Sequence, residues 1–119
     1  MAKPLSVEDM IPVQLGIIHR RTWILDINGS EVAFIKNLSK SEDLFGKAIS
    51  FQLDEILLSR DLIDECVQSK TPQKFCLTIK GIDQIGHIAQ MHQFHNAKLC
   101  QNGSSIHLSI QFESETLLY

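Results

Sequence analysis

The chain has 119 residues and a formal net charge of −3, with 44% hydrophobic and 21% charged residues. This length predicts a single domain that can bury a core without a disulfide or a metal. The acidic balance and the scattered lysines and arginines argue against a nucleic-acid surface, which needs clustered basic residues.

Three cysteines form no CxxC pair and leave one over, which is typical of reduced thiols in a reducing compartment. The first residues, MAKPLSVEDM, lack the apolar stretch of a secretory leader, and no apolar run reaches the roughly 18 residues that span a bilayer. We therefore expect a cytoplasmic domain without direct membrane insertion, which a longer, membrane-attached protein could still carry.

The first half of the chain predicts a flank, a hairpin and several helices. The capping pattern SVED at residues 6–9 opens a short helix within residues 1–21. Thr22–Ile27 is a predicted strand, and Asn28-Gly29 favours a type I′ turn, which needs positive φ at both central positions. Glu31–Lys36 is the predicted return strand.

Beyond this hairpin the pattern changes to turn and helix signals. Residues 37–41 are polar and predict a turn, residues 41–46 a single helical turn, and residues 47–58 loop and short helix. Ser59 is the expected N-cap of a longer helix, whose apolar stripe consists of Leu62, Ile63, Cys66 and Val67.

The second half returns to strand patterns. Lys74–Lys80, His87–Leu99 and Ser104–Phe112 are predicted strands, and Asn102-Gly103 is a second hairpin signal. Strands at both ends with helices between them indicate an α+β fold, with one antiparallel sheet and helices on one face.

The stretches ILDING, VAFIKN and DLFGKAI, followed by SRDLIDECVQSK and a closing NG hairpin, resemble a PAS domain, the sensory module of many bacterial signalling proteins. The resemblance implies a single antiparallel five-stranded sheet with short helices and one longer helix packed on one face. It divides the chain into an N-terminal helical flank (1–21), a sensory domain (22–112) and an exit segment (113–119) towards an output domain. It departs from the family after Asn37, where many relatives have a small residue and this chain has Leu38-Ser39-Lys40.

A ligand pocket would lie between the sheet and the central helix. Its candidate walls are Phe34, Phe45, Phe51, Leu62, Cys66, Ile79, Met91, Phe94, Ile106 and Leu108, although each of these residues could equally fill the core. Asn37 and His92 are the candidate polar groups, because a buried polar group without a partner is costly and often faces a ligand or water.

No catalytic or metal site is predicted. On a strand His92 points away from His87 and His95, and the latter two are roughly 26 Å apart. The resemblance to PAS domains implies that haem would need a histidine on the central helix and covalent flavin a cysteine directly after the second strand. Residues 20–86 contain no histidine and residues 39–44 no cysteine, so both are disfavoured and a cofactor stays unknown. Cys66 lies on the apolar stripe and is expected to be inert.

The leading prediction is a non-enzymatic sensory module. It would bind a small ligand or a partner and regulate an attached output domain such as a diguanylate cyclase or histidine kinase. The alternative is a ligand-free dimerisation or docking module, and a third reading is a small α+β enzyme of the cone-shaped barrel type with His92 as base. We also expect a homodimer, in which the apolar segment 10–15 either forms the contact or covers the sheet of its own chain.

Overall fold

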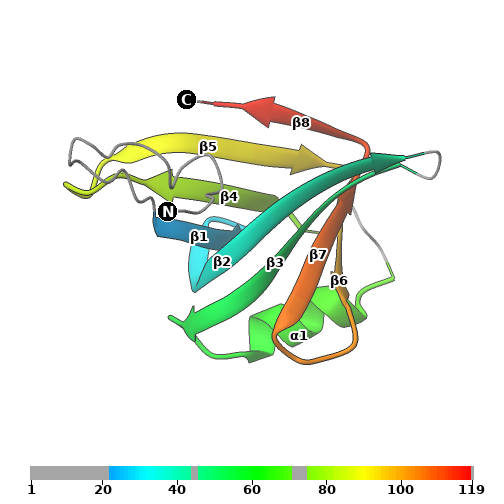
Figure 1. The fold of residues 1–119 in the computed structure, drawn as a ribbon. Helices are drawn as coiled ribbons and strands as arrows, with labels where there is room; N and C mark the ends of the chain where they lie inside the picture. Colours follow the sequence, from blue (N-terminus) through cyan, green and yellow to red (C-terminus); the bar gives the residue numbers. More distant parts are fainter. Residues whose placement is uncertain (1–21, 44–45, 71–74, 119) are drawn as a thin grey trace.

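A computed structural model describes residues 22–43, 46–70 and 75–118. In Figure 1 these residues form a strongly curved antiparallel sheet and a single helix. The elements are β1 (Thr22–Ile27), β2 (Ser30–Asp43), β3 (Gly46–Ile56), α1 (Asp61–Gln68), β4 (Leu77–Ile82), β5 (Ile88–His95), β6 (Lys98–Gln101), β7 (His107–Phe112) and β8 (Ser114–Leu117). The predicted N-terminal helix, the segment 10–15 and Phe45 lie outside the described residues.

The predicted fold class is wrong, and with it the fold that the PAS resemblance implies. The described residues form an eight-stranded sheet and one helix, instead of five strands and several helices. Residues 39–43, predicted as turn and helix, continue β2 and pair with residues 46–50 of β3. A β-bulge accommodates the turn preference of Asn37, whose φ is +56°.

The first hairpin is confirmed. Asn28 and Gly29 have φ values of +56° and +86°, the left-handed geometry of the turn that their sequence predicts. The Gly29 amide donates to the Asp26 carboxylate at 2.8 Å. Asn28 also exchanges two hydrogen bonds with the backbone of Cys76, each 2.8 Å long. The turn therefore also fixes the chain just before β4.

The four C-terminal strands form one long bent hairpin. His95 pairs with Ser114, and Lys98 pairs with Gln111, so the register continues unbroken from β5–β8 into β6–β7. The long strand predicted over 87–99 is thus present, with a bend after His95. At the bend Asn96 has a φ of +50°, and the Glu113 amide donates to the His95 carbonyl at 3.0 Å.

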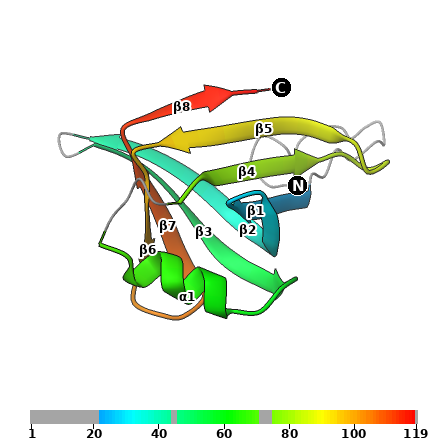
Figure 2. The same ribbon diagram turned by 180° about the vertical axis from the view of Figure 1, so that it is seen from behind.

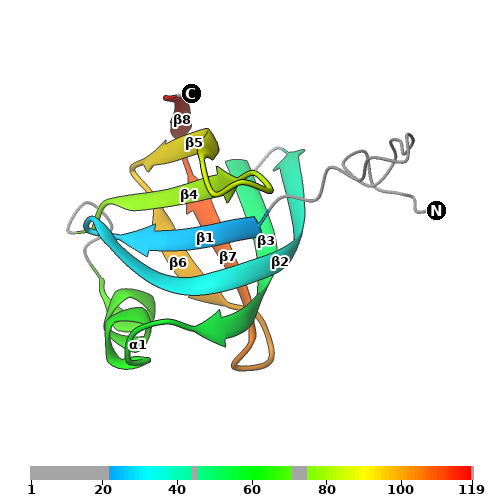
Figure 3. The same cartoon turned by 90° about the vertical axis from the view of Figure 1, so that its left-hand side faces the viewer.

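This hairpin closes the sheet into a barrel. The hydrogen-bonded order is β6-β7-β3-β2-β1-β4-β5-β8, and its ends belong to the two continuous strands β5–β6 and β7–β8. The continuous strand β5–β6 pairs with β4, and the continuous strand β7–β8 pairs with β3. The sheet is therefore a closed ring of six strands, which are β1, β2, β3, β4, β5–β6 and β7–β8. Figure 3 looks towards β1, β4 and β5, with β6 and β7 behind them. Closure removes most of the exposed sheet edge.

The helix covers one end of the barrel. Figure 2 shows α1 beside β6, at the end away from β8. Ile63 and Cys66 of the predicted stripe are buried, with Leu62 and Val67 packed against the core, so the predicted stripe is confirmed. The predicted N-cap is wrong, because the helix has Arg60 at this position instead of Ser59. Lys98 Nζ donates to the carbonyl of Val67 at 2.7 Å, where a cation stabilises the helix C-terminus.

Among the described residues, no helix has both the length and the apolar character needed to cross a membrane.

Candidate ligand-binding site

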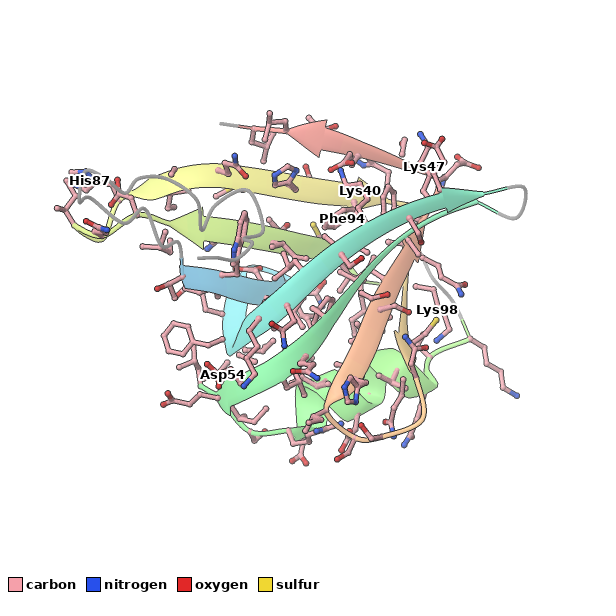
Figure 4. All side chains as sticks on the ribbon, viewed as in Figure 1. Lys40, Lys47, Asp54, His87, Phe94 and Lys98 are labelled. Atoms are coloured by element: carbon pink, nitrogen blue, oxygen red, sulfur yellow. The ribbon has the colours of Figure 1, made fainter. Side chains whose placement is uncertain are left out.

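A pocket of about 170 Å³ lies at the end of the barrel away from α1. Figure 4 labels two of its residues, Lys40 on β2 and Phe94 on β5, near the point where β8 passes above them. Its walls are Trp23, Leu38, Ser39, Lys40, Ile49, Ile79, His92, Phe94 and Glu115. These residues come from strands β1, β2, β3, β4, β5 and β8, so the pocket exists only when the barrel is closed.

Strand alternation explains why these side chains meet. Ile79 and Phe94 are buried and mark the inner face of β4 and β5. His92 pairs with Ile79, and Glu115 pairs with Phe94, which places both polar side chains on that same inner face. The polar residues of the pocket are therefore aimed into the barrel by the same register that builds the core.

Trp23 forms one wall through close contact with a glycine. Trp23 and Gly81 are paired on β1 and β4, and a Cβ atom added to Gly81 would lie 2.9 Å from the indole Cζ3. A side chain at this position would push the indole away, so the missing Cβ makes room for the ring.

A chain of polar contacts crosses the pocket. Lys40 Nζ donates to Glu115 Oε1 at 2.5 Å, and His92 Nδ1 donates to Glu115 Oε2 at 3.0 Å. The second ring nitrogen of His92 lies 3.2 Å from the side-chain amide of Gln90. These contacts link β8 to β2, which is not its neighbour in the sheet, and to β5, with which it pairs.

The Glu115 carboxylate is stabilised in its charged form. Burial raises the pKa of Glu115, but the hydrogen bonds from Lys40 and His92 outweigh burial and hold the pKa below its ordinary value of 4.5. This half-buried carboxylate, held in place by two hydrogen-bond donors beside apolar walls, can accept a hydrogen bond from a ligand.

The predicted wall residues are divided among several places. Ile79, His92 and Phe94 meet in the pocket, while Phe51, Cys66 and Leu108 fill the core. Leu62 packs against this core from α1. The remaining described candidates lie elsewhere: Phe34 is opposite Ile24 and Met91 opposite Lys80, on the outer face of the sheet, and Asn37 and Ile106 are exposed.

Sequence reasoning missed the residues that complete the pocket. Lys40 falls in a segment predicted as a turn, and Glu115 in the segment predicted as an exit, where the structure has β8. Trp23 and Leu38 gave no signal beyond an apolar side chain. Alternation along 114–117 was the available hint, because a short strand there would turn Glu115 and Leu117 to one face.

Asn37 belongs to a second polar chain on the outside of the barrel. Its amide donates to Gln52 Oε1 at 2.7 Å, and Gln52 Nε2 lies 2.6 Å from His107 Nε2. Since the Gln52 amide nitrogen is a donor, His107 Nε2 accepts, and Nδ1 then donates to Ser104 Oγ at 2.6 Å. His107 therefore does not act as a base towards Ser104. The hydrogen bonds that connect Asn37, Gln52, His107 and Ser104 are exposed to solvent.

Two of the three cysteines have pKa values raised by burial. Burial raises the pKa of the Cys66 thiol to about 11, which keeps it protonated and unreactive. Burial raises the pKa of Cys100 as well. Within the described ranges, no group of three His, Cys, Asp or Glu side chains is arranged to hold a metal ion.

A broader depression of about 500 Å³ lies along the bend, between β3 and the β6–β7 pair. Lys47 and Lys98 are its basic residues, but Lys98 Nζ is engaged by the carbonyl of Val67. The pocket beside Trp23 is smaller and combines apolar walls with converging polar groups, so it is the stronger candidate for a binding site.

Fold and pocket together define the chain as a small antiparallel β-barrel, covered by a helix at one end and hollow at the other. Comparisons of the chain with protein-family models, with curated proteins and with solved structures find no match.

Proposed function

We propose that this domain is a non-enzymatic module that binds a small ligand in the pocket beside Trp23. The observation that carries the proposal is the contrast between the two ends of the barrel. At one end α1 places the buried side chains Ile63 and Cys66 against the core. At the other end, charged and polar side chains converge on a cavity instead of an apolar cover.

The polar chain has a physical cost that a purely structural role does not explain. The side chains of Glu115 and His92 are 24% and 22% exposed, and drawing them partly out of water costs free energy that apolar residues of similar volume would not cost. Polar groups that converge beside apolar walls are typical of ligand pockets, which supports a binding role for this end of the barrel.

The pocket also suggests how binding would be transmitted. Glu115 lies on β8, and its contacts with Lys40 and His92 tie this strand to β2 and β5. A ligand that contacts Glu115 competes with or reinforces these bonds, and so favours one position of β8 over another. This is the kind of change that a sensory module passes to a partner.

The proposal is tested by filling the pocket. Ile49 lines it from β3, so Ile49→Phe should remove most of the cavity. The protein is screened against a library of fragments by thermal shift and by the NMR signal of Trp23, whose indole N–H is unique because the chain has one tryptophan. We expect hits that shift this signal and are lost in Ile49→Phe.

The matched control is Ile56→Phe, the same substitution at the exposed end of the same strand. It should keep every hit. Fragments that bind equally well to Ile49→Phe, or a library without any hit at Trp23, would show that the pocket is not a ligand site.

A second candidate function, docking through β8, is favoured by a separate observation. Within the described part of the chain, β8 hydrogen-bonds to β5 and has its other edge unpaired. Leu117 and Leu118 beside this edge are 58% and 48% exposed. We propose a second copy of the chain as the partner, because two antiparallel β8 strands related by a two-fold axis would satisfy each other.

Dimerisation is measured by light scattering at increasing protein concentration. The Leu118 amide donates to the Met91 carbonyl of β5, so by alternation the amide of Leu117 faces the unpaired edge. Leu117→Pro removes this donor and should shift a dimer towards monomer, whereas Thr22→Pro, at the first residue of β1, should not. A wild-type protein that stays monomeric up to about 1 mM would end this second proposal.

A further inference from the structure

We propose that the pocket selects a neutral aromatic alcohol with a single ring, of the phenol or benzyl alcohol type. This inference rests on the proposed ligand-binding function and specifies the chemical class of the ligand. It is carried by three properties of the pocket: its volume, the arrangement of its apolar walls and the charge balance of its polar end.

The volume admits one ring. The cavity of about 170 Å³ is close to the roughly 150 Å³ known to accommodate benzene in an apolar protein cavity. A second fused or linked ring would exceed it, and a ligand of only a few atoms would leave the apolar walls without contacts.

The walls are suited to a flat apolar body. Trp23 and Phe94 supply aromatic surfaces, and Leu38, Ile49 and Ile79 complete the lining. Aromatic side chains pack favourably against a ring in offset or edge-to-face arrangements. These residues lie on strands of the closed barrel, so the surface is rigid before a ligand binds, which lowers the entropic cost of binding.

The polar end suits a hydroxyl group. Each Glu115 oxygen already accepts one hydrogen bond, from Lys40 or from His92, and a carboxylate oxygen has room for a further donor. Lys40 carries two more N–H donors than its bond to Glu115 uses. A hydroxyl can donate to Glu115 and accept from Lys40 at the same time, which a group with donors only or acceptors only cannot do.

The charge balance disfavours ionic ligands. The formal charges of Lys40 and Glu115 cancel across a bond of 2.5 Å. A ligand ammonium group would have to displace Lys40 from Glu115, and a ligand carboxylate would have to displace Glu115 from Lys40. Either exchange leaves one side chain without its partner in a partly dry site. A neutral ligand joins the pair without breaking it.

The test compares four toluenes that differ in one para substituent: p-cresol, p-xylene, 4-methylbenzylamine and p-toluate. At pH 7 the phenol is neutral, the amine is cationic and the acid is anionic. Each compound is titrated into the intact chain, and the Kd is read from the Trp23 indole N–H signal. We expect p-cresol to bind about tenfold more tightly than each of the other three.

Two variants assign the preference to its cause. Glu115→Gln should bring p-cresol down to the affinity of p-xylene while p-xylene itself binds as before. Glu55→Gln, the same substitution at an exposed position of β3, should leave all four affinities unchanged.

The possible results distinguish the proposed ligand class from ligand binding in the pocket itself. If an ionic toluene binds as tightly as p-cresol, or p-xylene binds more tightly, the neutral alcohol is wrong and ligand binding stands. If none of the four compounds shifts the Trp23 signal, the neutral aromatic alcohol is wrong, and the fragment screen at Trp23 decides separately whether the pocket binds a ligand.

Discussion

The indole ring of Trp23 lies against the backbone of Gly81, so closely that a Cβ atom on Gly81 would be 2.9 Å from Cζ3 of the ring. The two residues pair across β1 and β4, on the inner face of the barrel, and the ring forms one wall of the pocket. The absence of a side chain at Gly81 thus determines where the indole ring of Trp23 lies.

Gly81→Ala should therefore displace the Trp23 ring into the pocket. We expect a shifted emission maximum of the single tryptophan and at least a tenfold weaker binding of any pocket ligand, with a loss of about 1–3 kcal/mol in stability from overpacking. Intrinsic fluorescence, ligand titration and urea denaturation measure the three effects. Gly103→Ala, in the β6–β7 loop away from Trp23, is the control for the fluorescence change. An unshifted emission maximum in Gly81→Ala would contradict the contact.

The Glu115 carboxylate should make stability depend on pH in a defined direction. Its pKa in the folded chain is held below the ordinary 4.5 by Lys40 and His92, despite the opposing effect of burial. The stabilisation is therefore complete above about pH 5 and is lost as the pH falls through the folded-state pKa. The difference in free energy of unfolding between wild type and Glu115→Gln should be largest near neutral pH and should shrink below about pH 4.

Urea denaturation at about pH 7 and pH 3 measures this difference. About 1 M NaCl should reduce it at the higher pH, since the side chains of Lys40 and Glu115 are both partly accessible to solvent. A difference that grows on acidification would reverse the predicted sign.

Much of the local structure was accessible from the sequence. The turn residues Asn28 and Gly29, the apolar stripe of α1 and the alternation of Leu108, Ile110 and Phe112 each follow from rules that involve near neighbours in the chain. In each case the structure has the predicted element, because side-chain burial and backbone preference agree there.

The overall fold and most of the pocket were not accessible in this way. Residues 39–43 are polar, and they are a strand because β3 supplies their hydrogen-bonding partners. Lys40 and Glu115 meet although 75 positions separate them. Contacts of this kind depend on the closure of the barrel, for which local propensity carries no signal.

Asp26 should be among the most sensitive charged residues of the chain. Its carboxylate is 3.1 Å from Lys80 Nζ, and the two side chains are 5% and 16% exposed. It also accepts from the amide of Gly29 in the hairpin turn. We expect Asp26→Ala to cost about 3 kcal/mol in the free energy of unfolding, because it leaves Lys80 with a single carboxylate partner, Glu31, and removes the bond to the turn.

The matched control is Asp54→Ala. Asp54 pairs with Lys36 at 3.6 Å, and both side chains are more than half exposed. Its loss should change stability by less than about 0.5 kcal/mol. Chemical denaturation measures both variants, and equal costs would contradict the importance of burial for the Asp26 pair.

The bend at Asn96 should depend on its left-handed backbone. Asn96→Ala places a Cβ-bearing residue of low left-handed propensity at a φ of +50° and removes the bond from Nδ2 to Glu113, which is 2.8 Å long. We expect a cost of about 1–2 kcal/mol. Asn96→Gly keeps the backbone geometry and loses the exposed side-chain bond, so it should cost less than Asn96→Ala. The reverse order in thermal unfolding would show that the side-chain bond matters more than the backbone.

The strand pairing continues without a break through this bend and connects the core of the barrel to the pocket. In β5 the even-numbered residues His92 and Phe94 face the pocket, whereas in β6 the odd-numbered Leu99 is buried in the core, so the inward face shifts by one position at the bend. One extra residue inserted after Asn96, with β6 held in place, would turn His92 and Phe94 to the outside of the barrel. Whether the number of residues between Phe94 and Leu99 is odd or even therefore decides whether the side chains of β5 face the pocket. An insertion here would remove the binding site without changing any residue that lines it.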